Sequence, residues 1–409
     1  GGSGGTSAGG SGGTPSLGGP RVGNEIHVNT TLPEDQEHPR AAMADDGRFV
    51  VVWMSRGQVA AGNSELFGQR FNADGTKAGG EFQVSSTKAS SLYYGPDNYD
   101  VTMAPDGRFV VAWSGYGSAD RAVYAQAYNA DGSKNGARAT VDNTTDQWTE
   151  YKVSVAVNKS GEFTVLFDWE KGFATGLKAR MYSPAAAPKA AAFWVTNVRR
   201  AYEIDLGVAD SGNLVAVWRY FDIDTEVFGQ RIDAAGTLAG TEFHVNSSIA
   251  KAQDKPAVAV KSDGSFLVAW QSAHAAPSPS VGVYAQRFDS SAAKLGAEVA
   301  VSLATTGYME QPAVGVDNTG RWVVAWANDG GPAAGNSDEI WAQRFNADGT
   351  RPEATFRVNT FDQNDQDDPR LAMASGGRFV IVWSDRKQEE TVAGNTTHDS
   401  GVFAQIFQP

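Results

Sequence analysis

The segment Gly107-Arg-Phe-Val-Val-Ala-Trp113 decides the fold of this chain, because variants of it occur seven times. They begin at Gly47, Gly107, Gly161, Gly212, Gly264, Gly320 and Gly377, between 51 and 60 residues apart. Each variant is a short run of apolar, β-branched and aromatic residues, which favours a strand buried on both faces. A unit that recurs at this period is typical of a repeat architecture and not of unrelated domains.

Three further strand-like segments accompany each copy. One precedes it, as in Pro256–Val260, and two follow it, as in the alternating Val283–Phe288 and the short Glu242–Val245. Asp-Gly turns separate the first and second segments, and Asn-Ala-Asp-Gly turns separate many of the third and fourth, at hairpin spacing. Four antiparallel strands per repeat predict an all-β, seven-bladed β-propeller.

The two ends of the repeat region predict how the ring closes. The chain opens on a lone fourth strand, Glu25–Thr30, and finishes on a third strand, Val402–Phe407, that lacks its fourth. We therefore expect the N-terminal strand to complete the last blade, which removes the open sheet edge. The propeller is assigned to residues 21–409. Residues 1–20 are rich in Gly, Ser and Thr and are assigned to a flexible tether.

Composition excludes several classes of function. The formal net charge of −13 argues against nucleic acid as a partner, because such binding needs a basic surface. The longest apolar run, Phe49–Met54, is far below the roughly 20 residues of a transmembrane helix. The chain has no cysteine, so it has no disulfide, no thiol nucleophile and no cysteine-ligated metal.

Candidate ligand-binding residues fall in the connections between the second and third strands, in those between blades, and at the channel. The short turns lie on one face of such a ring, and the long connections lie on the other, where function on repeat scaffolds usually resides. Aromatic side chains suited to stacking on a sugar or peptide occur in blades 2 to 4: Tyr93, Tyr94, Tyr116, Trp148, Trp169, Tyr202, Tyr220 and Phe221. When the first strands of the repeats are aligned, one position differs from blade to blade although its neighbours recur. In four of the blades this position holds a charged residue: Arg40, Asp100, Asp205 and Arg370.

An acidic segment before the last blade predicts a metal site. Asp362, Asn364, Asp365 and Asp367 place oxygen ligands in a short run, which suits Ca²⁺, although the Gly and terminal Glu of an EF-hand loop are absent. The alternative is a solvated acidic loop. A carboxylate also recurs two residues before Pro39 and its equivalents, as in Glu37, Asp97, Asp254, Glu310 and Asp367, a recurrence that favours a structural role.

Catalytic motifs are scarce. His38, His274 and His398 lie on different blades, and no phosphate-binding loop or GxSxG elbow occurs. The sequence therefore favours a protein that is not an enzyme. A catalytic pair of carboxylates of the hydrolase type remains an alternative, because sequence alone does not give the distance between two side chains.

The repeated motifs GRFVVAW, VFAQRFNADGT and EFxVNT resemble a propeller-type repeat of large secreted and surface proteins of bacteria, often near haemolysin-type calcium-binding modules. The resemblance covers residues 25–409 and is weakest in blade 3, where Lys178-Ala-Arg180 replaces the usual Ala-Gln-Arg. It implies an extracellular or cell-surface location. The Gly-rich tether also looks like that of bacterial surface lipoproteins, which implies a lipid anchor before processing.

Three functions are carried forward. The leading expectation is a non-enzymatic binding or adhesion module that recognises a glycan or an extracellular protein, with Ca²⁺ ordering the acidic sector. The first alternative is a structural subunit that self-assembles through its N-terminal arm. The second is a polysaccharide-degrading enzyme that uses Arg, Asp and Tyr residues at the channel mouth.

Overall fold

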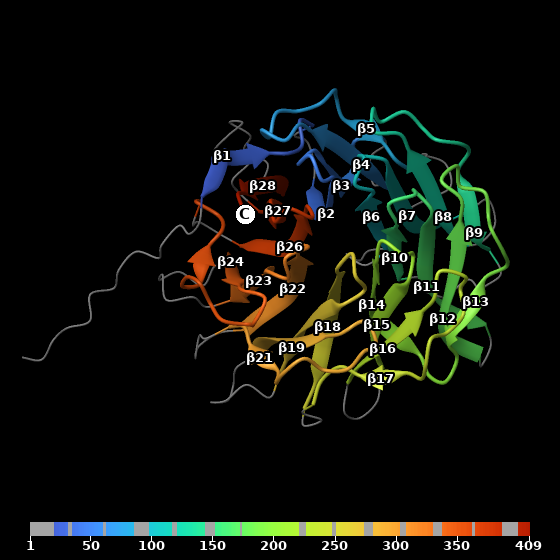
Figure 1. The fold of residues 1–409 in the computed structure, drawn as a ribbon. Helices are drawn as coiled ribbons and strands as arrows, with labels where there is room; N and C mark the ends of the chain where they lie inside the picture. The colour runs from blue at the N-terminus through green and yellow to red at the C-terminus, as the bar shows by residue number, and fades with distance from the viewer. Residues whose placement is uncertain are drawn as a thin grey trace, which may run out of the picture.

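The computed structural model confirms a ring of seven four-stranded antiparallel sheets around a central channel (Figure 1). It describes residues 20–31, 35–59, 63–85, 98–116, 121–143, 152–171, 174–220, 226–247, 251–273, 281–302, 308–329, 338–361, 365–386 and 400–409. Every regular element in these ranges is a strand. In this described part of the chain, no helix is long and apolar enough to cross a membrane.

Each blade runs outward from the channel in chain order. Blade 1 contains β2 (Gln36–Met43), β3 (Phe49–Arg56), β4 (Ser64–Phe71) and β5 (Phe82–Gln83); blade 2 contains β6 (Tyr99–Met103), β7 (Phe109–Tyr116), β8 (Arg121–Tyr128) and β9 (Ala139–Asp142). Blade 3 contains β10 (Val153–Val157), β11 (Phe163–Lys171), β12 (Ala174–Tyr182) and β13 (Phe193–Thr196); blade 4 contains β14 (Ala201–Val208), β15 (Leu214–Tyr220), β16 (Val227–Ile232) and β17 (Phe243–His244). Blade 5 contains β18 (Gln253–Val260), β19 (Phe266–Ser272), β20 (Gly282–Phe288) and β21 (Val299–Ala300); blade 6 contains β22 (Tyr308–Val316), β23 (Trp322–Asp329), β24 (Glu339–Phe345) and β25 (Phe356–Arg357).

Blade 7 joins the two ends of the chain, as the sequence predicts. It contains β26 (Gln366–Met373), β27 (Phe379–Asp385) and β28 (Gly401–Phe407), and its outer strand is β1 (Arg21–His27). Pairing begins at Arg21 opposite Phe407 and ends at His27 opposite Phe403. The ring is therefore closed by backbone hydrogen bonds between the N-terminal and C-terminal strands.

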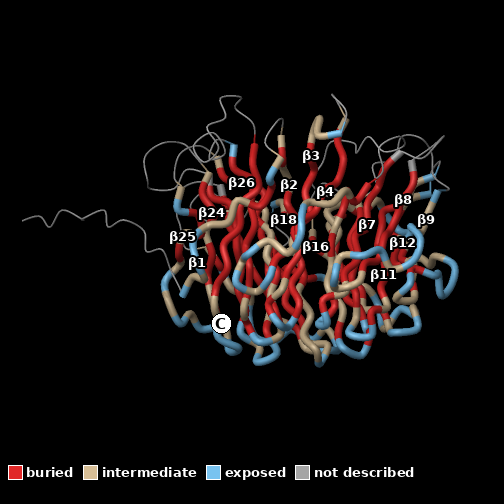
Figure 2. The backbone as a smooth tube through the Cα atoms, turned by 90° about the horizontal axis from the view of Figure 1, so that it is seen from above, coloured by how far each residue is buried: buried red, intermediate tan, exposed pale blue. Residues whose placement is uncertain are grey.

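Tight turns occupy one face of the ring. In blade 1, the amide of Gly47 donates to Ala44 O at 3.0 Å, and the amide of Gly75 donates to Asn72 O at 3.0 Å. Both glycines have φ above +80°, a conformation that L-residues with a side chain rarely adopt. The exposed turns form the lower edge of the ring in Figure 2.

The core lies between neighbouring blades. The repeated tryptophan of the second strand is fully buried in Trp53, Trp218, Trp270 and Trp383. In blades 1 and 5 its indole donates to a first-strand glutamine, from Trp53 to Gln36 at 3.1 Å and from Trp270 to Gln253 at 2.9 Å. These bonds tie the second strands to the first strands, part of whose residues line the channel.

Candidate functional site in the central channel

The first strands of all seven blades enclose a cavity of about 340 Å³. The variable first-strand position lines it in every blade, with Arg40, Asp100, Ser154, Asp205, Ala257, Ala313 and Arg370. Charged groups thus occupy four of these positions, and small residues occupy the other three. The wall is basic where blades 7 and 1 meet and acidic across blades 2 to 4.

A bulge in five first strands sets the geometry of the channel mouth. His38, Glu203, Lys255, Gln311 and Asp368 have φ between 49° and 57°, and each lies where the register with the second strand shifts. Such conformations cost about 1–3 kcal/mol each and cluster at functional sites. A bulge also redirects side chains. Four of the five residues precede a proline, which is the sequence signal that could have located them.

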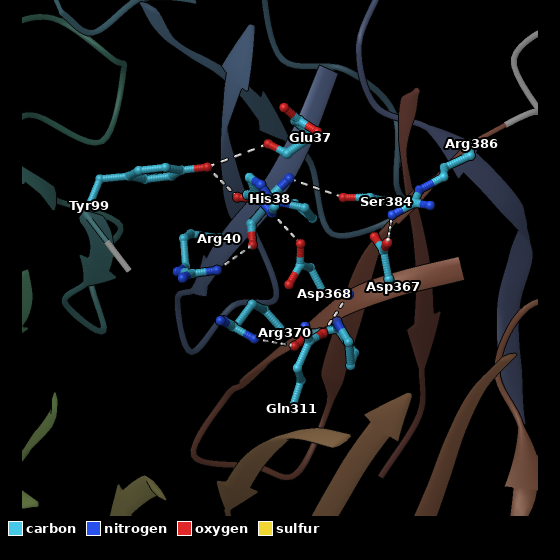
Figure 3. Close-up of polar contacts among 12 residues, drawn as sticks. Glu37, His38, Arg40, Tyr99, Gln311, Asp367, Asp368, Arg370, Ser384 and Arg386 are labelled. Carbon is cyan, nitrogen blue, oxygen red and sulfur yellow. Dashed lines mark hydrogen bonds and ion pairs between the residues drawn. The ribbon is translucent and has the colours of Figure 1, made fainter. Parts of the chain in front are cut away.

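His38 and Asp368 form an ion pair between blades 1 and 7 (Figure 3). The imidazole Nδ1 contacts the carboxylate of Asp368, and the backbone amide of His38 donates to Ser384 Oγ at 3.0 Å. The hydroxyl of Tyr99, on the neighbouring blade 2, donates to the backbone carbonyl of His38. Three blades thus hold this histidine in place. Sequence reasoning missed the pair, because only the fold brings residues 38 and 368 together.

Arg40 of β2 and Arg370 of β26 line the same cavity, and both lie close enough to Asp368 to lower its pKa (Figure 3). Each donates to the carbonyl of the proline before it, Arg40 to Pro39 O at 3.2 Å and Arg370 to Pro369 O at 2.8 Å. The guanidinium of Arg40 also lies 5.6 Å from the centre of the Tyr99 ring. Two guanidinium groups on one wall are suited to a carboxylate or sulfate ester, which guanidinium binds with two parallel hydrogen bonds.

Burial and charge act in opposite directions on the His38–Asp368 pair. Burial disfavours both charged forms, but their mutual hydrogen bond and attraction are stronger in sum, so the pKa of His38 is raised and the pKa of Asp368 is lowered. Arg370 and Arg40 lower the pKa of Asp368 further. His38 therefore carries its proton into a higher pH range than an exposed histidine does.

Asp100 and Asp205 face each other across Ser154. The Ser154 hydroxyl lies 3.0 Å from Asp100 Oδ2 and 3.3 Å from Asp205 Oδ1. Asp100 Oδ2 and Asp205 Oδ1 can therefore lie no farther apart than these two distances added together. Retaining glycosidases hold their carboxyl groups about 5–5.5 Å apart, whereas inverting enzymes need about 6.5–9.5 Å.

Backbone amides of the next blade fix both carboxylates. Asp100 accepts a hydrogen bond from Val155 N at 2.9 Å, and Asp205 accepts one from Val258 N at 2.7 Å. Burial raises the pKa of Asp205, and the charge of Asp100 raises it further, to about 6. Burial also raises the pKa of Asp100, although Val155 N and the Arg40 charge partly offset this. Asp205 thus holds a proton in the mildly acidic range.

Carboxylates of the recurring position at the ends of the first strands pair with arginines. Glu37 binds Arg56 at 2.6 Å, Asp254 lies 3.3 Å from Arg219, and Asp367 binds Arg386 at 3.2 Å. Asp97, the equivalent residue in blade 2, lies outside the described residues. These pairs link first strands to arginines at the ends of second strands.

The aromatic candidates of blades 2 to 4 occupy different settings. Tyr220 is 3% exposed, and its hydroxyl contacts Thr196 and Glu242, so we leave it out of the proposed site. Tyr202 lies beside the guanidinium groups of Arg200 and Arg219. Trp169, on β11, packs edge-on against Trp194 of β13 and under Lys178 of β12. Tyr93, Tyr94, Trp148 and Phe221 lie outside the described residues, as does the side chain of Tyr116.

The predicted calcium site falls only partly within the described residues. Asp362 and Asn364 lie outside them, whereas Asp365 and Asp367 both bind Arg386, at 3.3 and 3.2 Å. No group of three or more metal-ligating side chains occurs among the residues that the structure describes. Calcium binding therefore stays a prediction.

No protein-family model and no curated protein matches the chain. Several solved structures share its fold. The polysaccharide lyase Uly1 aligns with a TM-score of 0.54 and 9% identity over 94% of this chain and 92% of the lyase. The GH93 α-L-arabinofuranosidase of Fusarium graminearum aligns with a TM-score of 0.52 and 13% identity, over 95% and 97% of the two chains. The phage phi92 endosialidase aligns with a TM-score of 0.55 and 8% identity, over 95% of this chain and 69% of the endosialidase.

These neighbours correct the leading expectation from the sequence. A non-enzymatic binding or adhesion module was expected, whereas solved structures with a similar fold include a polysaccharide lyase, an α-L-arabinofuranosidase and an endosialidase. The expectation failed because it judged catalysis by linear motifs, and the first-strand groups of a propeller meet only when the ring closes. At such low identity the neighbours show a likeness of fold alone, and the chemistry must be argued from the channel.

Proposed function

We propose that the protein is a polysaccharide-degrading enzyme that cleaves glycosidic bonds of an acidic glycan in the central channel. One observation supports the proposal most strongly. The wall of the cavity carries two arginines, Arg40 and Arg370, in one part and two carboxylates bridged by Ser154, Asp100 and Asp205, in another. The carbohydrate-active neighbours with a similar fold support it. An extracellular location fits a polymeric substrate and is part of the proposal.

Arg40 and Arg370 bind the carboxylate or sulfate groups of the glycan and fix its register in the channel. Because a guanidinium fork matches a carboxylate in two hydrogen bonds, this contact favours charged sugars over neutral ones. His38 and Tyr99 support this wall, since His38 contacts Asp368 beside Arg370 and Tyr99 packs beside Arg40.

Asp205 is the general acid, and Asp100 is the nucleophile. Asp205 donates its proton to the glycosidic oxygen as the bond from that oxygen to the anomeric carbon breaks, and Asp100 forms an ester with that carbon. Water then attacks the same carbon, Asp205 takes a proton from it, and the ester bond to Asp100 breaks. The separation through Ser154 supports this retaining route.

One observation favours β-elimination as a second candidate reaction. Arg40 and Arg370 line the cavity together and would neutralise a uronate carboxylate, which makes the neighbouring C5 proton easier to remove. Elimination moves the C5 proton to a base, breaks the C4–O bond, gives a proton to the leaving oxygen and leaves a C4–C5 double bond without consuming water.

Digestion of uronic-acid polysaccharides in H₂¹⁸O separates these possibilities. Hydrolysis is expected to place ¹⁸O at the new reducing end, and Asp205→Asn should reduce the rate by at least about 10²-fold, the lower range for loss of acid–base catalysis. Ultraviolet-absorbing unsaturated products without ¹⁸O would assign elimination instead. Absence of any product from a panel of acidic glycans would reject the proposed function.

A further inference from the structure

Ser154 lies between the two carboxyl groups that the proposed reaction uses. It belongs to β10, which pairs with β11 in a continuous register, so Ser154 stands opposite Leu166 without a bulge. Ser154 is 2% exposed, whereas Asp100 and Asp205 are half-buried and line the cavity. The hydroxyl is therefore placed to act on a glycan through the two carboxyl groups and not by direct contact.

Packing does not require a hydroxyl at this position. The equivalent residues of blades 5 and 6, Ala257 and Ala313, line the same cavity with a methyl group. Serine occurs here only in blade 3, which lies between the blades of the two aspartates. Both side-chain oxygens that its hydroxyl contacts belong to carboxyl groups. These carboxyl groups therefore explain the hydroxyl better than packing does.

A single hydroxyl can donate to only one of the two carboxyl groups at a time. Ser154 Oγ lies 3.0 Å from Asp100 Oδ2, within the usual range of about 2.5–3.0 Å, and 3.3 Å from Asp205 Oδ1, beyond that range. It therefore donates to Asp100 in this structure. A protonated Asp205 can direct its proton to Ser154 Oγ or, with a glycan bound, to the glycosidic oxygen, whereas a charged Asp205 can accept the serine proton.

The backbone donors of the two carboxyl groups are matched and fixed. Each carboxyl group accepts from the amide of the following residue and from one amide of the next blade. These amides are Val101 N and Val155 N for Asp100, at 2.8 and 2.9 Å, and Leu206 N and Val258 N for Asp205, at 2.9 and 2.7 Å. Among the described donors to the pair, the serine hydroxyl is thus the one that can turn from one carboxyl group to the other.

We propose that Ser154 is a positioning residue whose hydroxyl follows the negative charge from Asp100 to Asp205, an inference that rests on the proposed retaining hydrolysis. Before cleavage, Asp100 is charged and receives the hydrogen bond, so Asp205 is the group that keeps the proton. Once Asp100 has formed its ester and Asp205 has given up its proton, the charge lies on Asp205. Rotation about the Cβ–Oγ bond then turns the same hydroxyl to Asp205, and no covalent bond of Ser154 breaks. Because hydrogen bonds to a charged oxygen are the stronger ones, the hydroxyl stabilises the charge on both sides of the step.

Titration of the two carboxyl groups tests this inference without a substrate. Carboxyl ¹³C signals of aspartate-labelled protein are followed by NMR, and the two signals are identified by their loss in Asp100→Asn and Asp205→Asn. We expect Ser154→Ala to raise the pKa of Asp100, which loses a donor to its charged form, and to lower the pKa of Asp205, which loses an acceptor for its proton. Ser154→Thr keeps the hydroxyl and should restore both pKa values. Unchanged pKa values in Ser154→Ala, or a rise of both, would overturn the proposal.

Kinetics separates this role from a structural one. On a glycan that the wild type cleaves, Ser154→Ala should lower kcat at least about tenfold at a nearly unchanged KM, because the hydroxyl does not bind the substrate. Ser85→Ala is the matched control, since it removes a buried hydroxyl that accepts from Leu66 N on blade 1, and it should leave kcat unchanged. Shifted titrations with an unchanged kcat would overturn the role of Ser154 in the reaction.

The two readouts also distinguish the failure of this inference from that of the proposed function. An enzyme that cleaves acidic glycans but shows unshifted titrations in Ser154→Ala would overturn the inference alone. A protein that cleaves no acidic glycan would overturn the proposed function and, with it, the role of Ser154 in the reaction.

Discussion

Replacing Asp205 by asparagine tests the electrostatics of the channel in depth. The Asp205 carboxyl has an ordinary pKa of 3.8, and burial followed by the charge of Asp100 raises it to about 6 in the folded protein. The folded state therefore binds this proton more tightly than the unfolded state does. Because the charged form is penalised, folded stability falls as the pH rises from about 4 through about 6 and then stays level.

The size of the effect follows from the shift. A difference of roughly two pKa units corresponds to a loss of up to about 3 kcal/mol of unfolding free energy between pH 4 and pH 8. Asparagine carries no charge over this range, so Asp205→Asn should lack this part of the pH dependence. Two backbone amides, Leu206 N and Val258 N, donate hydrogen bonds to the Asp205 carboxylate. Because asparagine has only one side-chain oxygen, one of these amides loses its acceptor, at a pH-independent cost of about 1–3 kcal/mol.

The assay is urea unfolding followed by tryptophan fluorescence at several pH values between 4 and 8. The unfolding free energy of the variant minus that of the wild type is expected to rise from pH 4 to pH 7. The pH-independent cost of the lost hydrogen bond shifts this difference by a constant and does not change its slope. Asp210→Asn, at an exposed aspartate paired with Lys159, is the control and should follow the wild-type curve. Parallel curves for Asp205→Asn and the wild type would refute the assignment of a raised pKa to Asp205.

Four further predictions follow from particular contacts. Arg40→Lys and Arg370→Lys should each weaken binding of an acidic oligosaccharide by about tenfold in calorimetry, because lysine cannot form the two-bond contact; unchanged affinity would remove the arginines from the site. Gly132→Ala should lower the melting temperature, because the φ of Gly132 is +85° and an added Cβ would lie 2.5 Å from Arg70 Nε. Gly80→Ala is the control and should leave the melting temperature unchanged, because no atom lies within 4 Å of its added Cβ. Equal effects of the two substitutions would contradict the argument that the turn requires glycine. Tyr99→Phe should cost about 1 kcal/mol of unfolding free energy through the lost bond to His38 O, and a neutral substitution would show that this bond contributes nothing. Millimolar Ca²⁺ should raise the melting temperature, reversibly with chelator, if the acidic segment at 362–367 binds it; an unchanged value would remove calcium from the account.

The fold could be predicted because its determinants are local and repeated. Seven copies of one strand motif fix the number of blades, and Asp-Gly turns fix the hairpins. The seam between β1 and β28 could also be predicted, because the two incomplete blade fragments at the chain ends are complementary. Each of these inferences needs only the order of residues within one repeat.

The site could be predicted only in part, because it depends on contacts between repeats. The variation at Arg40, Asp100, Asp205 and Arg370 indicated the channel wall in advance, and all four line the cavity. The His38–Asp368 pair was not predicted, because it depends on how blades 1 and 7 meet in space, which sequence spacing does not encode. The bulges were not predicted either, although four of the five residues that adopt them precede a proline.

The central claim is tested most directly by comparing a polyuronate with its carboxyl-reduced, neutral form as substrates. The account predicts that the wild type releases new reducing ends from the polyuronate at least tenfold faster than from the reduced polymer. It also predicts that Arg40→Ala combined with Arg370→Ala abolishes this preference. Equal rates on the two polymers, or a preference that survives the double substitution, would contradict recognition of an acidic glycan by the arginine wall of the channel.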